Sequence, residues 1–215
     1  MTLIEKQKAK LEKYFEDKLA KVIEDSSDFP MLLMVLGDKE AALTMNADEE
    51  QTKLLKEFAE AFDLDIRVYE GRESKPDKPG AENPSFNQKG VFLAVNEERF
   101  DILESSEGRF YGFSDEAVGE FLGFPESSIK FFNSTEQPGL ESRKRINKMK
   151  KDEKFDGDLK YLNLTTYIPA PDRESIEEAI EKGVKREKAL NRLDEENNVE
   201  IGHRYLEDRF SKSFY

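Results

Sequence analysis

The segment Ser114–Phe132, SDEAVGEFLGFPESSIKFF, is the most constrained part of this chain and sets our first expectation for its fold. Ser114 is a favoured helix N-cap, and Gly123 tolerates the left-handed conformation that often ends a helix. Pro125 suits the start of a second helix, because no backbone donor is needed there. The segment therefore predicts two short helices joined by a tight corner, with Phe132 facing the core.

Amphipathic helices are predicted at both ends of the chain, where apolar residues recur at three- and four-residue spacing. They cover Leu3–Glu24, a long helix capped by Asp172, and a C-terminal helical extension over residues 191–215. A further helix, Leu140–Lys151, is strongly basic. Residues 71–89 hold three prolines and two glycines, and we expect a flexible loop there.

Short runs rich in apolar and β-branched residues predict strands between these helices. The expected strands are Met31–Leu36, Ala41–Met45, Ile66–Tyr69, Val91–Val95, Phe100–Leu103, Arg109–Phe113 and Leu159–Ile168. The Phe100–Leu103 run fits a helical turn equally well. We therefore expect a single α+β domain over residues 1–215, with one mixed, largely antiparallel sheet of about five to six strands flanked by amphipathic helices.

The residue types that are missing limit the chemistry. Cysteine is absent, and His203 is the sole histidine. These facts exclude disulfides, thiolate nucleophiles, cysteine-ligated metal centres and any site built from several imidazoles. The sequence also contains no Gly-rich phosphate loop and no nucleophile elbow. It therefore favours a non-enzymatic role, and it predicts no cofactor and no metal site.

The net charge of −13 at pH 7 bears on the class of partner. A field of this sign repels phosphate backbones over most of the surface and favours cationic ligands or basic protein partners. The N-terminal residues lack a signal-peptide core, and the longest apolar run, Met31–Leu36, is far too short to cross a bilayer. We expect a cytoplasmic protein that does not bind membranes and whose partner is another protein or a second copy of itself.

Residues 114–151 also fit a second hypothesis, a helix-turn-helix that binds DNA. Gly119 and Gly123 stand four residues apart, as small residues do where two such helices approach closely, and a basic run follows. The candidate binding residues are Glu126, Ser127, Ser128, Lys130, Arg143, Lys144 and Arg145. Recognition helices present Arg, Lys, Asn or Gln to base edges, whereas this second helix would present Lys130 beside the acidic Glu126. A DNA-binding regulator is therefore the alternative to a protein-binding role.

Two short motifs stand out in the second half of the chain. They are residues 122–128, LGFPESS, followed by Phe131 and Phe132, and residues 168–175, IPAPDRES. Both resemble motifs of a family of archaeal conserved proteins of unknown function, in which Gly-aromatic-Pro-Glu is followed by two cysteines and the second motif also carries cysteines. The residues that occupy cysteine positions here are Ser127, Ser128, Ala170 and Arg173. The resemblance implies a retained scaffold that has lost any metal or redox role of those cysteines.

Carboxylates are the abundant catalytic groups, which leaves a carboxylate- or Mg²⁺-dependent enzyme as a third hypothesis. An acidic turn gathers Asp152, Glu153, Asp156 and Asp158, without the ligand order of a calcium loop. His203 is the best single candidate for proton transfer. Because no catalytic motif accompanies these residues, our leading hypothesis is a non-enzymatic protein-binding module that meets its partner through an exposed helical surface.

Overall fold

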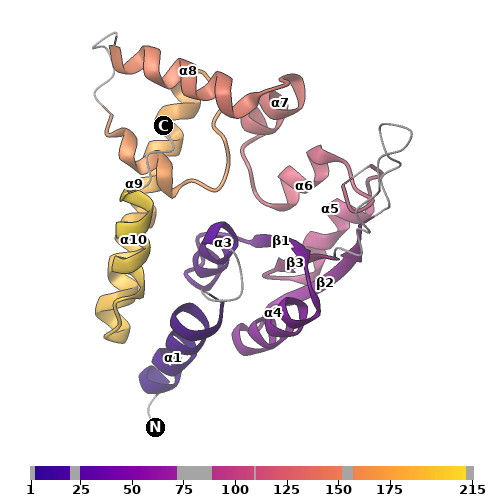
Figure 1. The fold of residues 1–215 in the computed structure, drawn as a ribbon, viewed down its shortest axis with the longest axis vertical. Helices are drawn as coiled ribbons and strands as arrows, with labels where there is room; N and C mark the ends of the chain where they lie inside the picture. The colour runs from indigo at the N-terminus through magenta and orange to yellow at the C-terminus, as the bar shows by residue number, and fades with distance from the viewer. Residues whose placement is uncertain (1–2, 20–24, 72–88, 109, 152–156, 212–215) are drawn as a thin grey trace, which may run out of the picture. The chain divides into compact units, whose positions relative to one another are not determined.

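The computed structural model describes residues 3–19, 25–71, 89–108, 110–151 and 157–211. The chain forms two compact units (Figure 1). The central unit consists of residues 18–123, and the terminal unit joins residues 1–17 to residues 124–215. Each unit has a buried hydrophobic cluster of its own.

The central unit holds a three-stranded antiparallel sheet. Strand β3 (Lys89–Ala94) lies in the middle, between β1 (Ala41–Ala47) and β2 (Asp65–Glu70). Because β1 and β2 are each antiparallel to β3, they run parallel to each other, and helix α4 (Glu49–Phe62) connects them and packs on all three strands. The predicted strands at residues 41–45, 66–69 and 91–95 are thus confirmed.

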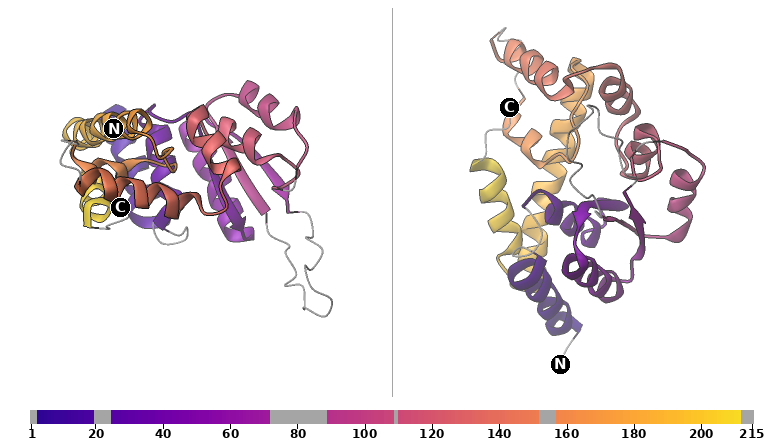
Figure 2. Two further views of the ribbon diagram at one scale, coloured as in Figure 1. Left: turned by 90° about the horizontal axis from the view of Figure 1, so that it is seen from above. Right: turned by 45° about the vertical axis from the view of Figure 1, so that its right-hand side comes forward.

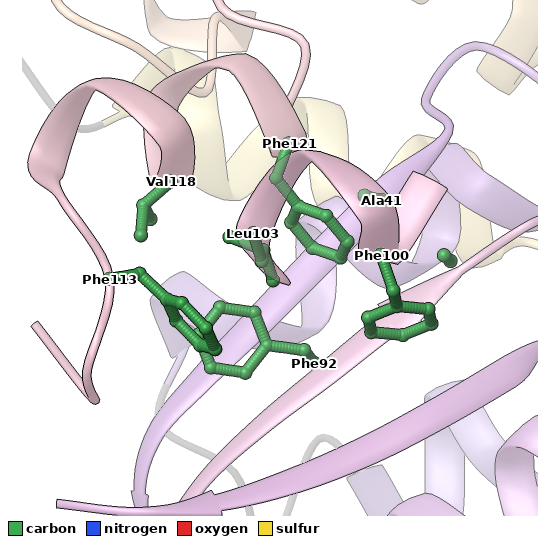
Figure 3. Packing of buried hydrophobic residues seen from close by; sticks show 8 residues of the cluster. Ala41, Phe92, Phe100, Leu103, Phe113, Val118 and Phe121 are labelled. Atoms are coloured by element: carbon green, nitrogen blue, oxygen red, sulfur yellow. The ribbon is translucent and has the colours of Figure 1, made fainter. Parts of the chain in front are cut away.

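One face of this sheet packs on an aromatic cluster (Figure 3). Side chains alternate along β3, so Phe92 and Ala94 point to the same face. The ring of Phe92 meets Phe121 at a centroid distance of 5.6 Å and Phe113 at 5.9 Å. The helices beside this face are η2 (Glu97–Arg99, a 3₁₀ helix), α5 (Phe100–Glu104) and α6 (Asp115–Phe121). The core of this unit therefore depends on α5 and α6 as much as on the strands.

The expected sheet of five to six strands is wrong, because the described residues form one sheet of three strands and are mostly helical. Of the expected strand Met31–Leu36, residues 31–35 belong to helix α3 (Asp25–Val35) and residue 36 lies in the turn that follows. The side chains of Phe29 and of residues 31–34 are all buried. A short apolar run fits a helix buried on every side as well as a strand buried on both faces, and periodicity does not separate the two.

Three other expected strands also take different structures. Phe100–Leu103 forms α5, the helical alternative, and residues 159–164 form the 3₁₀ helix η3 (Leu159–Leu164). Residues 110–113 make a tight turn in which Phe110 and Phe113 exchange backbone hydrogen bonds of 3.1 and 2.8 Å; Arg109 lies outside the described residues. Aromatic and β-branched residues favour a packed surface of any kind, and this preference does not require strand pairing.

The regular elements of the terminal unit are all helices within its described residues, and irregular segments such as residues 165–172 connect them. Its elements are α1 (Leu3–Glu12), η1 (Lys13–Lys18, a π-helix that contains the boundary at residue 17), α7 (Glu126–Ser134), α8 (Pro138–Lys151), η3, α9 (Arg173–Asn197) and α10 (Ile201–Ser211). Figure 2 shows α9 running along this unit with α10 beside it. The buried cluster between α8, η3 and α9 includes Ile146, Leu162 and Ile176.

Several predicted features of the terminal unit are observed. The basic helix predicted at residues 140–151 is α8. Asp172 caps α9, because its Oδ1 atom accepts the backbone N–H of Ser175 at 2.8 Å. Helix α9 continues to Asn197 before α10 begins, while most of the predicted loop, residues 72–88, lies outside the described residues.

Candidate functional site

Helix α8 is amphipathic, and one side of it belongs to the core of the terminal unit. Ser142, Ile146 and Met149 are buried at spacings of four and three residues. The Ser142 hydroxyl donates a 3.0 Å hydrogen bond to the carbonyl oxygen of Pro169, so the one polar group on this side has a partner. This buried side determines which residues of α8 face solvent.

The opposite side of α8 is a row of cations that begins at an apolar residue. Leu140 is 45% exposed, and the exposed side chains that follow on the same side are Arg143, Lys144, Asn147, Lys148 and Lys151. At 3.6 residues per turn these six positions fall within an arc of about 140°. We call Leu140, Arg143, Lys144, Lys148 and Lys151 the α8 stripe.

Within the described residues, most cations of the α8 stripe have no ion-pair partner. Lys144 lies 2.7 Å from a carboxylate oxygen of Glu141. In the described part of the chain, no carboxylate lies within ion-pair distance of Arg143, Lys148 or Lys151. The sequence-predicted residue Arg145 is half-buried at the edge of this stripe. The structure therefore groups the predicted cations Arg143 and Lys144 on one exposed surface.

Helix α7 precedes α8 and carries a large exposed ring. Phe132 is 51% exposed, so the expectation that it faces the core is wrong. Glu126 and Lys130 form an ion pair one turn apart, and the hydrogen bond from Lys130 lowers the pKa of the Glu126 carboxyl. Ser128 is buried, whereas Ser127 is exposed. Residues 135–137 alone separate α7 from α8, so Phe132 and the α8 stripe lie on consecutive helices.

The two motifs that carry the family resemblance meet at the starts of α7 and α9. Ser175 lies 48 residues after Ser127, and the Oγ atoms of these two serines are 3.2 Å apart in a hydrogen bond. This hydrogen bond therefore connects the first turn of α7 to the first turn of α9. The resemblance itself stays a prediction.

His203 lies apart from these contacts, on the first turn of α10. Its Nε2 atom is 3.2 Å from Glu207, and its backbone N–H donates to Asp194 at 2.7 Å. Neither partner is among the residues that the sequence singles out. The arrangement makes His203 an exposed helix residue with an ordinary ion-pair neighbour.

The predicted helix-turn-helix spans the boundary between the two units. Ser114 caps α6 by accepting the N–H of Ala117 at 3.2 Å, and Gly123 ends this helix with a φ of +69°. The boundary follows at once, so α6 belongs to the central unit and α7 to the terminal unit. The two helices of the motif therefore belong to different units, and DNA binding stays an untested hypothesis.

The acidic residues that the sequence singles out lie only partly within the described ranges. Within the described residues, no group of three or more His, Asp or Glu side chains could hold a metal ion. Asp152, Glu153 and Asp156 lie outside those residues, while Asp158 caps η3 by accepting the N–H of Lys160 at 3.1 Å. No helix in the described ranges is long and apolar enough to span a membrane.

Comparison with known proteins adds no functional information. No protein-family model, no curated protein and no solved structure matches this chain. The site must therefore be argued from its own residues. Sequence reasoning missed Leu140, whose position outside the buried spacing of 142, 146 and 149 is the signal that could have revealed its exposure.

Proposed function

We propose that this chain is a protein-binding module and that its contact surface in the terminal unit consists of Phe132 and the α8 stripe. The observation that carries the proposal is the pairing of two exposed apolar side chains, Phe132 and Leu140, with a row of exposed cations. Single exposed apolar residues are common, but an exposed aromatic residue on α7, followed on α8 by an exposed leucine and an arginine, matches the residue types enriched at interface centres.

The energetics of burial support this surface. Phe132 and Leu140 are 51% and 45% exposed, so covering the exposed half of either side chain would contribute about 0.7–1.5 kcal/mol. Exposed ion pairs contribute less, about 0.2–1 kcal/mol each, and mainly determine orientation and the rate of encounter. We therefore expect each apolar side chain to contribute at least as much affinity as any single ion pair, and the cations together to select the partner.

Affinity capture from the native cell extract tests the proposal with three baits. They are the unmodified chain, the double variant Phe132→Ser with Leu140→Ser, and the control Met45→Ser, which alters a 55% exposed side chain of the central unit. We expect one protein to be retained by the unmodified chain and by Met45→Ser, and to be reduced at least about tenfold on the double variant. The absence of any retained protein, or equal retention by all three baits, would contradict the proposal.

A further inference from the structure

The α8 stripe has the opposite charge to the chain as a whole. Residues 126–151 contain seven Lys and Arg against three Glu, a net charge of +4 in a chain of net charge −13. We infer that the partner of this surface presents an acidic amphipathic helix, an inference that rests on the proposed function. The overall charge favours basic partners, but binding depends on the local surface that a partner touches.

The geometry of the stripe favours a helix as the complementary element. Positions 143, 144, 148 and 151 follow helical spacing and span about 12 Å along the axis at 1.5 Å per residue. A second helix lying along α8 advances by the same rise, so Glu or Asp at three- and four-residue spacing would come opposite successive cations. Leu140 begins the row, and the partner therefore needs an apolar side chain at one end of its acidic face.

The rest of the chain disfavours an extended polyanion. Since the whole chain carries −13 and residues 126–151 carry +4, the remaining residues carry −17. Duplex DNA bears about one charge per 1.7 Å and an anionic bilayer is charged over its whole area, so either would extend beyond α8, whose 14 residues are about 21 Å long. Phosphates within a Debye length of about 8 Å from other acidic groups would be repelled. A single acidic helix no longer than α8 places fewer of its charges beyond the stripe, so it meets less of this repulsion.

Fluorescence anisotropy with a defined probe tests the inference on the full chain. The probe is a labelled peptide of about 14 residues with Glu at three- and four-residue spacing and one terminal Leu. The comparison peptide has Lys in place of every Glu. We expect the full chain to bind the acidic peptide at least about tenfold more tightly than the basic one, with affinity falling as the salt concentration rises.

Two matched triple variants locate the binding surface. The stripe variant, Arg143→Gln with Lys144→Gln and Lys148→Gln, removes three of the four positive charges of the stripe. The control variant, Lys185→Gln with Lys188→Gln and Arg192→Gln, removes the same charge from exposed positions of α9. Each exposed ion pair changes affinity by a factor of about 1.4 to 5, so the stripe variant should bind about tenfold more weakly. The α9 variant should lose less than about twofold. Circular dichroism of both variants confirms that the helices remain folded.

Several outcomes would overturn the inference. One is an equal loss of peptide affinity in the two triple variants. Another is tighter binding to duplex DNA or to phosphatidylserine vesicles than to the acidic peptide. The third is light scattering that shows the partner to be a second copy of the chain. A captured protein that is lost with Phe132→Ser and Leu140→Ser but retained by the stripe variant would leave the proposed function intact and remove the acidic partner. If the acidic peptide binds specifically to the stripe but no protein is captured, the preference for acidic helices is supported and the proposed function is contradicted.

Discussion

Gly183 and Gly202 show how single residues determine packing in the terminal unit. A Cβ atom at Gly183 would lie 2.3 Å from the carbonyl oxygen of Tyr161, and one at Gly202 would lie 2.3 Å from that of Leu190. Helix α9 therefore meets η3, and α10 meets α9, at distances that exclude any side chain. Gly139 in α8 differs, because its nearest atom would be Ile168 Cδ1 at 3.8 Å.

Substitution of these glycines separates packing from helix propensity. Alanine is the better helix former by about 1 kcal/mol, so Gly139→Ala should leave stability unchanged or raise it by up to about that amount. Gly183→Ala should lower the free energy of unfolding by about 2 kcal/mol or more, because backbone atoms must move apart to admit the methyl group. Urea denaturation of both variants measures the difference. Equal effects of the two substitutions would show that the close approach of α9 to η3 is not required.

At the scale of the element, α10 is held at its start by one carboxylate. The two oxygens of Asp194 accept the backbone N–H groups of Gly202 and His203, each at 2.7 Å. Before this point Asn198 ends α9 in the left-handed conformation, and its carbonyl oxygen accepts a 2.9 Å hydrogen bond from Lys8. Asp194 therefore fixes the direction in which the chain returns along α9.

Removing this carboxylate should loosen α10. Asp194→Ala leaves two helix N–H groups without their acceptor, and we expect it to lower the free energy of unfolding by about 1–2 kcal/mol. Glu195→Ala, at the exposed neighbouring position, is the control and should change stability by less than about 0.5 kcal/mol. Thermal and urea unfolding of the two variants provide the comparison. A loss of similar size in both would mean that Asp194 acts through its general charge rather than as a cap.

At the scale of the whole molecule, each of the two units has a buried hydrophobic cluster among its described residues. Phe92 is fully buried in the aromatic cluster of the central unit, and Ile176 is fully buried between η3, α8 and α9 in the terminal unit. Units with cores of their own open as cooperative regions of local unfolding. A change in one core should therefore affect mainly the unit that contains it.

Hydrogen–deuterium exchange can test this independence. Phe92→Ala should cost about 3–5 kcal/mol and Ile176→Ala about 2–5 kcal/mol, since each leaves a cavity. We expect faster exchange within residues 25–71 and 89–123 for Phe92→Ala, and within residues 124–151 and 157–211 for Ile176→Ala. Faster exchange across both units in either variant would show that the chain unfolds as a single cooperative structure.

Local signals within the chain were sufficient for much of the secondary structure. The caps at Ser114 and Asp172 and the left-handed residue Gly123 were predictable, because each makes or permits hydrogen bonds within a few residues of itself. The three strands of the sheet were predictable from short apolar runs next to turns. For the candidate site, the cations Arg143 and Lys144 could be named because they belong to a run of basic residues in a segment predicted to be helical.

Burial, by contrast, depends on which distant segments pack together. Residues 31–35 of one apolar run form a helix that packs on β1, with residues 31–34 buried, whereas Phe132 stays 51% exposed. Packing between distant segments also decides three other features. They are the contact of Ser127 with Ser175, the assignment of α6 and α7 to different units, and the exposure of Leu140. Hydrogen bonds that close over three or four residues are encoded locally, whereas the choice of the face that water reaches is made by the folded units as wholes.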